Sequence, residues 1–314
     1  MDSIKTNFSA MTALQALQAT NKELLKSQQR ISTGYRVATA EDNAAYWSIS
    51  TTMRSDNKAL STVMDALGLG SATIDVAYTA LNSAIEVTSE IKAKLVAARE
   101  PGVDRQKVQS EIAELQNQLQ SNADSAVFSG QNWLSVDSSL AGYNATKSVV
   151  ASFTRASDGT INVGTITFTL DDSKLYDASA SDVGILDALR DSTGAKSASG
   201  TFSVATLDIS ALTDSSADLT TLEDYIRGVD AAITEMTAAG TSLGSTKKRI
   251  SLQQTFVKVL IDAIERGVST LVDADMNEES TRLQALQVQQ QLGVQALSIA
   301  NSSSQNILSL FRNG

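Results

Sequence analysis

The 314-residue chain contains no cysteine, no histidine and a single proline, and aromatic residues make up only 5% of it. Without cysteine or histidine, structural zinc sites of the usual kind, thiol nucleophiles, histidine general bases and disulfides are excluded. The net charge of −10 argues against binding to a nucleic-acid backbone, which requires a basic surface. We therefore expect no zinc site of the usual kind, no thiol or histidine catalysis and no nucleic-acid partner.

Long apolar runs are missing as well. No stretch reaches the roughly 18 apolar residues that a membrane-spanning helix needs. The first ten residues, MDSIKTNFSA, lack the apolar core of a secretory signal. We expect no membrane association and, if the protein leaves the cell, export without cleavage of a signal peptide.

A seven-residue apolar repeat is present on both sides of the middle of the chain. Such a repeat is typical of long helices that pack as a coiled coil. A 50-residue helix is about 75 Å long, so we expect a mainly α, elongated antiparallel coiled-coil helical bundle formed by both chain ends. In the two halves the repeat positions are Tyr46, Met53, Leu60, Leu67, Ile74, Leu81 and Leu95, interrupted by Thr88, and Leu222, Val229, Met236, Leu243, Ile250, Val257, Ile264 and Leu271.

A shorter third helix is expected to follow the break at Pro101 and Gly102. Proline disfavours helix in the residue before it, and Asp104 is a suitable N-cap for a new helix. This helix is predicted to end near residues 128–130. Its apolar stripe would consist of Val108, Ile112, Leu115 and Leu119.

The middle of the chain has a different composition. No glutamate occurs between Glu114 and Glu223, and serine, threonine, asparagine and aspartate take over the polar positions. These residues favour turns and caps over helix interiors. We predict a small β-rich outer domain at 139–217, inserted in the bundle. Its expected elements are alternating strands around 149–153 and 165–170 joined by a turn at Asp158-Gly159, a short helix with Val183, Leu186 and Leu189 after a cap at Ser181 or Asp182, and a strand with Phe202, Val204, Leu207 and Ile209.

The two chain ends are also predicted to be helical, over 1–33 and 276–311. From Leu283 to Phe311 there is no charged side chain, although apolar residues occur on more than one side of the helix. A solvated helix normally carries charge on its outer face, so this one is expected to have protein neighbours all round. The predicted polymerisation residues are Leu14, Leu17, Leu24, Ile31, Leu283, Leu286, Leu292, Leu297, Ile307, Leu310 and Phe311.

Head-to-tail contact between the paired ends of different copies would give rings or open helical filaments. The alternative is that the ends pack on their own bundle or stay disordered. In the connection between helices, Gly34 would supply backbone freedom, and Arg30 and Arg36 would pair with acids of neighbouring copies. The predicted connection and inter-subunit residues are Arg30, Gly34, Arg36, Asp42, Asn43 and Trp47.

Two sequence motifs carry a family resemblance. The segment QRISTGYRV at 29–37, continued by AEDNAA at 40–45, resembles the N-terminal signature of bacterial flagellins. The segment QQLGVQALSIAN at 290–301, followed by NILSLFR at 306–312, resembles the matching C-terminal signature. The runs NAAYWSI at 43–49 and GQNWL at 130–134 are similar to flagellins of alphaproteobacteria of the rhizobial and agrobacterial kind.

The resemblance implies a flagellin that polymerises into the flagellar filament for swimming, outside the cell and without a cleaved signal peptide. It implies a structural protein that is not an enzyme, with no catalytic, cofactor or metal site. It implies as partners further copies of the chain, sister flagellins, an export chaperone, and junction and cap proteins. Alternatives are a hook–filament junction protein, a flagellin with a protease insertion, which the lack of histidine excludes, and a monomeric adhesin. The expected segments are an N-terminal inner-core helix at 1–40, bundle at 41–138, the outer domain at 139–217, bundle at 218–274 and a C-terminal inner-core helix at 275–314.

Two departures from the family pattern concern immune receptors. In the 22-residue stretch 29–50, which resembles an epitope of plant receptors, Asn43 replaces an acidic residue and Tyr46 a small one. In the stretch that aligns with the one animal receptors contact, Glu90 stands where stimulating flagellins carry arginine, and Lys94 where they carry leucine. Reversing the charge of a hot-spot arginine is costly, so weak recognition by the animal receptor is expected. The two replacements in the stretch 29–50 imply weak recognition by the plant receptor as well.

Some local patterns have a plain reading. Gly68-Leu69-Gly70 is half of a dinucleotide fingerprint, but it lies inside a heptad run, which favours a helix. Trp47 and Trp133 favour packing in the core or between subunits. The basic run 246–249 is interpreted as a solvated helix face or as an ion-pair partner of another subunit.

Overall fold

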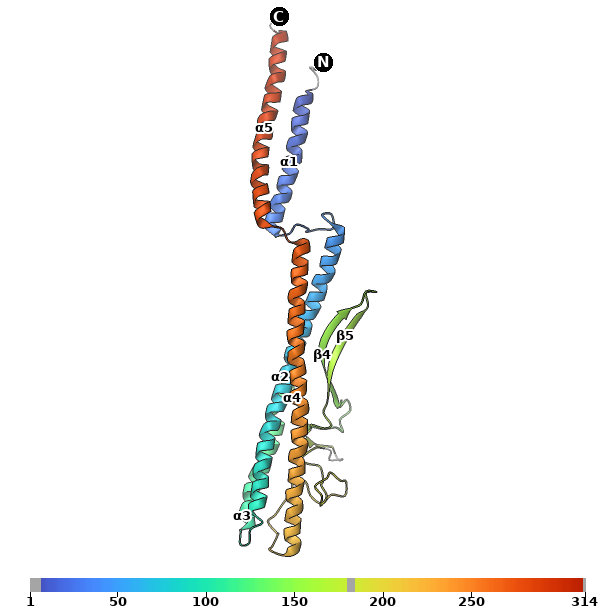
Figure 1. The fold of residues 1–314 in the computed structure, drawn as a ribbon, viewed down its shortest axis with the longest axis vertical. Coiled ribbons are helices and arrows are strands. Elements are labelled where there is room, and N and C mark those ends of the chain that lie inside the picture. The colour runs from blue at the N-terminus through green and yellow to red at the C-terminus, as the bar shows by residue number, and fades with distance from the viewer. Residues whose placement is uncertain (1–6, 180–183, 313–314) are drawn as a thin grey trace. The chain divides into compact units, whose positions relative to one another are not determined.

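The computed structural model describes residues 7–179 and 184–312, with side chains described up to residue 302. The fold is mainly α with a small β-containing middle, as predicted (Figure 1). Two compact units form, one from residues 1–58 and 261–314 and the other from residues 59–260. The helices are α1 (Phe8–Thr33), α2 (Ala44–Ala97), α3 (Arg105–Ser125), α4 (Ser216–Val272) and α5 (Met276–Arg312), and the strands are β1 (Val127–Phe128), β2 (Gln131–Asn132), β3 (Ser135–Val136), β4 (Thr146–Arg155), β5 (Ile161–Thr169) and β6 (Tyr176–Asp177).

Helices α1 and α5 form an antiparallel pair in the first unit (Figure 1). At one end of the pair, the Asn7 side chain donates a hydrogen bond to the carbonyl oxygen of Ala300. At the other end, the Ser27 hydroxyl donates to the carboxylate of Glu279. The chain ends therefore pair with each other within one copy over most of their length.

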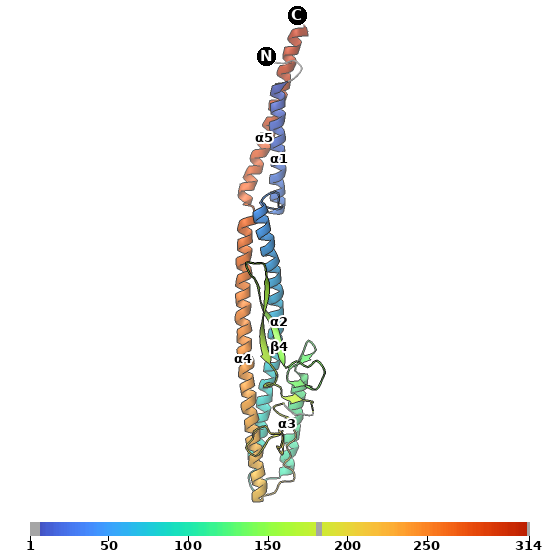
Figure 2. The ribbon, with the colours of Figure 1, turned by 90° about the vertical axis from the view of Figure 1, so that its right-hand side faces the viewer.

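Helices α2 and α4 run antiparallel along the second unit (Figure 2). Lys92 forms a salt bridge with Asp230, and Asp75 forms one with Lys247. The two salt bridges are separated by the same number of residues on α2 and on α4, in opposite directions along the chain. The two helices therefore keep one register between the bridges. Most of the predicted heptad positions are accordingly buried: Leu60, Leu67, Ile74, Leu81, Leu95, Leu222, Val229, Met236, Leu243, Ile250 and Val257. Met53, Ile264 and Leu271 are partly buried, and Tyr46, in the first turn of α2, is exposed, so the stripe was predicted to begin too early.

Helix α3 starts as predicted, with the Asp104 carboxylate accepting a hydrogen bond from the backbone of Lys107. The next residue, Arg105, is buried and forms a salt bridge with Asp214. The helix ends at Ser125, slightly before the predicted end, and the short hairpin of β1 and β2 follows it.

The predicted pair of alternating strands is confirmed as the antiparallel hairpin of β4 and β5, in which Val149 pairs with Ile166. Gly159 has φ of +87° in the turn between the strands. Phe168 stacks on Trp133 with ring centroids 5.8 Å apart. Trp133 is buried and packs against the β4–β5 hairpin, which confirms the predicted core packing and not the alternative contact between subunits.

Two predicted elements of the middle segment are wrong. The stretch with Phe202, Val204, Leu207 and Ile209 is buried but forms turns, not a strand. Its backbone carbonyls accept hydrogen bonds from a helix side chain, because Gln116 of α3 donates to Val204 and Leu207. The alternation of apolar residues therefore indicated that the side chains of this loop are buried, not that its backbone pairs in a sheet.

The short helix predicted after residue 182 is also absent from the described part, 184–189. The amide of Ile185 donates to the carbonyl of Lys174, and that of Leu186 donates to Leu175, so neither makes the local bond of a helix. Ser181, Asp182 and Val183 lie outside the described residues. Further on, the buried Arg190 binds both carboxylate oxygens of Glu235 and ties this loop to α4.

Candidate assembly surface

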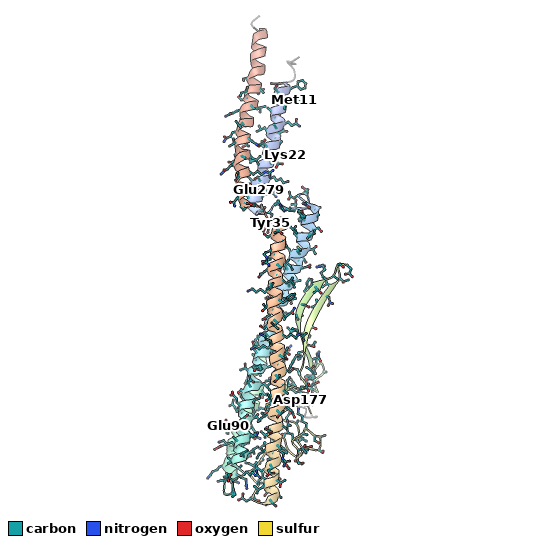
Figure 3. The ribbon with its side chains drawn as sticks, in the orientation of Figure 1. Met11, Lys22, Tyr35, Glu90, Asp177 and Glu279 are labelled. Atoms are coloured by element: carbon teal, nitrogen blue, oxygen red, sulfur yellow. The ribbon has the colours of Figure 1, made fainter. Side chains whose placement is uncertain are left out.

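The base of the α1–α5 pair is held by a buried carboxylate. Glu279, near the start of α5, accepts hydrogen bonds from the Ser27 hydroxyl and the Arg30 guanidinium, both at 2.8 Å (Figure 3). Burial by itself raises the pKa of Glu279, but the hydrogen bonds from Arg30 and Ser27 outweigh it, so the pKa lies below its usual value. Arg30 was expected to pair with an acid of a neighbouring copy, and its partner here is an acid of its own chain.

The chain turns sharply where α1 ends. Gly34 has φ of +75° and caps the helix in the left-handed conformation, which glycine adopts without a steric penalty. Tyr35 then pairs with Asp273 in an isolated antiparallel bridge. The Arg36 guanidinium donates to the last carbonyls of α4, including that of Leu271 at 3.1 Å. The predicted acid partner of Arg36 is replaced by helix-end carbonyls, which carry the negative end of the helix dipole.

A small core fixes this connection. The side chain of Val37 is buried with those of Val268 and Val272 near the C-terminal end of α4. Partly buried hydrophobic residues from α2 and α4 pack around these three, namely Met53, Ile264 and Leu271. The strand-like segment after Gly34 is therefore anchored by packing as well as by backbone bonds.

The remaining connection residues shape the start of α2. The Asp42 carboxylate accepts hydrogen bonds from the backbone of Ala38 and Thr39. Asn43 caps α2, since its side chain accepts a bond from the backbone of Tyr46. Tyr46 and Trp47 follow on the helix surface with about two-fifths of each side chain exposed, 41% and 40%.

The predicted polymerisation residues separate into two groups in the structure. Leu17, Leu24 and Ile31 of α1 are partly or fully buried on the α5 side, and so are Leu283, Leu286 and Leu297 of α5 on the α1 side. Leu14 and Leu292 lie outside this seam and are exposed. The side chains of Ile307, Leu310 and Phe311 lie outside the described part.

Apolar residues on the outside of the pair form the second surface. On α1 a shallow groove is lined by Phe8, Met11 and Leu14 together with Thr12, Gln15 and Gln18 (Met11 is labelled in Figure 3). On α5 the exposed apolar residues beyond its first turn include Val288, Leu292, Val294 and Ile299. Sequence reasoning missed Phe8 and Val288 because residues were selected by the heptad stripe. The lack of charge over 283–311 was the signal that could have found Val288.

The two epitope-like positions on the bundle are accessible to different extents. Glu90 is exposed on α2, whereas the Lys94 ammonium group lies 2.5 Å from the Glu111 carboxylate of α3. This pairing raises the pKa of Lys94. Lys94 therefore stays charged and is tied to its own bundle.

Two further kinds of feature, metal-binding groups and membrane-spanning helices, are not found among the described residues. Within 7–179 and 184–312, no three acidic residues come together as a possible metal site. None of the helices in that part of the chain combines the length and the apolar character needed to cross a membrane. The half-fingerprint Gly68-Leu69-Gly70 lies inside α2 and not in a phosphate-binding loop.

Paired terminal helices with apolar residues on both the inner seam and the outer face fit a subunit of a larger assembly. The bacterial flagellin N-terminal helical region matches residues 4–138, and the bacterial flagellin C-terminal helical region matches residues 226–311. The chain is 51% identical over 323 residues to Flagellin C of Rhizobium meliloti (strain 1021), which covers 99% of this chain and all of that protein.

Two further relatives agree. Flagellin A of Rhizobium meliloti is 43% identical over 397 residues, and Flagellin of Brucella melitensis biotype 1 is 45% identical over 313 residues, each covering 99% of this chain and all of the relative. The chain belongs to the bacterial flagellin family and is a structural subunit of the flagellar filament. The predicted resemblance to alphaproteobacterial flagellins is confirmed.

Proposed function

We propose that the outer apolar faces of α1 and α5 are the surfaces through which copies of this chain polymerise. Val288, Leu292 and Ile299 are spaced by four and seven residues and so share one face of α5, more than half exposed at 54%, 57% and 69%. On α1 the Phe8 and Met11 side chains are exposed to a similar extent, 66% and 56%. Contact between copies would remove these side chains from water.

The two faces differ in sequence and shape, so their contact joins different surfaces of successive copies. Such a heterologous contact repeats and gives a filament when the rotation does not close into a ring. The inner seam of each pair is already filled, since a Cβ on Gly293 would lie 3.1 Å from Leu17. Further copies therefore add on the outside. As part of this proposal, the helices at 1–40 and 275–314 form the inner core, the segments 41–138 and 218–274 form the bundle, and 139–217 forms the outer domain.

Deletion of residues 283–314 tests the surface. We expect the truncated chain to keep its bundle, by circular dichroism, and to form no filaments when seeded with filament fragments. Two point variants sharpen the test: Leu292→Glu and Ile299→Glu should each impair assembly strongly, while Gln289→Glu adds the same charge to the same helix at an exposed polar position and should not. Filaments from the truncated chain, seen by electron microscopy, would count against the assignment.

The finer biological role follows from family membership and is part of the proposal. The chain is exported without signal cleavage and assembles outside the cell, alone or with sister flagellins, with the help of an export chaperone and of junction and cap proteins. A hook–filament junction protein is the alternative. The number of copies per filament separates the two, because a junction protein forms a ring and not a long polymer.

Weak immune recognition is also proposed. The cap formed by Asn43 and the exposed ring of Tyr46 alter the epitope-like stretch 29–50, and Glu90 presents a negative charge on α2. A synthetic 29–50 peptide is expected to give a weak oxidative burst in plant tissue. Reporter cells carrying the animal receptor should respond weakly to the whole protein, and a full response at nanomolar dose in either assay would contradict the proposal.

A further inference from the structure

The outer face of α4 carries an apolar stripe that the bundle does not use. Leu252, Phe256 and Val259 are 60%, 59% and 58% exposed, whereas Ile250 and Val257 on the inner face are at most 1% exposed. The spacing of four and three residues places the three exposed side chains on one face of the helix. A helix face in water is normally polar, so this stripe has the character of a contact surface.

Two unpaired cations flank the stripe. Lys248 lies one turn before Leu252, and Arg249 lies two turns before Phe256. Within the described residues neither makes a salt bridge, in contrast to the neighbouring Lys247, which pairs with Asp75. Both residues belong to the basic run 246–249, for which the proposed function gives no role. A partner that fits here has an apolar centre with an acid beside it.

The chain itself offers such a partner on α2. Leu69 is 55% exposed, although Leu67 and Ile74 on the same helix are fully buried. Asp65, one turn before Leu69, is exposed and makes no salt bridge among the described residues. An exposed leucine with a free acid one turn away complements a stripe flanked by free cations.

The register of the bundle puts the two surfaces at one level. Asp75 pairs with Lys247, and the helices run antiparallel, so Leu69, six residues before Asp75, lies level with residue 253, six after Lys247. Residue 253 falls within the stripe. Both surfaces point away from the buried heptad seam of their own helix, so they serve neighbours on different sides of one molecule.

We infer that the stripe of Leu252, Phe256 and Val259 on one copy packs against the α2 surface around Asp65 and Leu69 of a second copy of this chain. Like-on-like contact of two stripes would bring Lys248 and Arg249 against their own copies, so the contact joins unlike faces. The inference rests on the proposed function and adds to it a lateral contact within the bundle, away from the terminal helices. It repeats from copy to copy, as a filament requires.

Disulfide mapping tests the contact, because the chain has no cysteine of its own. The double variant Leu69→Cys with Phe256→Cys is assembled under reducing conditions, checked for filaments by electron microscopy, and then oxidised. We expect covalent multimers on a non-reducing gel from filaments and only single chains from dissociated protein. The control is Val96→Cys with Phe256→Cys: Val96 is 50% exposed, but it lies 27 residues beyond Leu69, about 40 Å along the helix, and should give no multimers.

A charge exchange tests the same contact without a disulfide. Asp65→Lys and Arg249→Glu should each raise the critical concentration for assembly severalfold, and the double variant should return it toward the unmodified value. Filaments that give no cross-links, together with a double charge variant that assembles no better than the singles, would overturn the inference while leaving the proposed function in place. An unmodified chain that forms no filaments would overturn both.

Discussion

The Glu279 carboxylate and the Arg30 guanidinium form a 2.8 Å ion pair that joins the base of α5 to the end of α1. The carboxylate is almost fully buried, with 7% of its side chain exposed, and the Ser27 hydroxyl donates a second bond to it. Ion pairing and hydrogen bonding of this kind favour the charged form of a buried carboxylate over the neutral form. The stability of the α1–α5 pair should therefore depend on whether Glu279 is ionised.

The substitution Glu279→Gln should weaken the terminal helix pair. Hydrogen bonds to charged groups contribute about 2 kcal/mol each, so we expect a loss of that order in the free energy of opening α1 from α5. Hydrogen exchange of α1 amides measures it. Glu278→Gln is the matched control, because Glu278 is the exposed neighbour and makes no salt bridge among the described residues. Equal effects of the two variants would contradict the assigned role.

Acidification should act through the same group. The folded pKa of Glu279 lies below the ordinary value of 4.5, so its contribution is fully present above 4.5 and is lost as the pH falls through the folded pKa. We expect protection of α1 to decline as the pH falls below 4.5, through the lowered folded pKa of Glu279. The decline should be smaller in Glu279→Gln, which has no carboxyl group to protonate there. The same slope in both proteins would show that other groups control the transition.

Two neighbouring glycines of α2 should respond in opposite directions to alanine. A Cβ on Gly70 would lie 2.5 Å from a methyl group of Val149, so Gly70→Ala must displace the β4–β5 hairpin and should cost about 1–3 kcal/mol. A Cβ on Gly68 meets nothing within 4 Å, so Gly68→Ala should stabilise the helix by up to about 1 kcal/mol. Denaturant unfolding of the monomer measures both. Destabilisation by Gly68→Ala would contradict the geometry.

Replacing Thr88, the residue that interrupts the N-terminal heptad repeat, should stabilise the bundle. Thr88 is fully buried, and its hydroxyl has no hydrogen-bond partner. Thr88→Val keeps the shape and removes the unsatisfied group, so we expect about 1 kcal/mol of stabilisation in chemical unfolding. Thr52→Val on the exposed face serves as control and should change stability by less than about 0.5 kcal/mol. A less stable Thr88→Val protein would mean that the hydroxyl is satisfied in solution.

The left-handed cap of α1 should not tolerate a side chain. At φ of +75°, alanine in place of Gly34 is strained by about 1 kcal/mol, although no atom lies within 4 Å of its Cβ. Gly267→Ala is the comparison, since Gly267 lies inside α4, also with nothing within 4 Å of a Cβ. Gly34→Ala should lower the thermal midpoint of the unit formed by residues 1–58 and 261–314, and Gly267→Ala should not. Equal midpoints would remove the special role of Gly34.

Periodic patterns made the helical part of the fold predictable. The heptads that place Leu67 and Val257 in the core repeat over many turns, and each repeat adds the same evidence for burial on one face. The N-cap at Asp104 and the breaks at Pro101 and Gly34 act through the local backbone, so they too could be assigned from neighbouring residues. The family motifs at the chain ends were specific because long runs match in order.

The long helices, the β hairpin, the uncharged C-terminal end and the family all follow from the sequence alone. The packing of the helices was needed to show that Leu17 lies in the inner seam whereas Leu14 faces outward, because a helical wheel does not say where the partner helix lies. It also decided that Arg30 pairs with Glu279 in its own chain, and that Phe202 to Ile209 form loops. Contacts between residues far apart in the chain depend on how the helices pack, and alternation of apolar residues reports burial without saying what covers them.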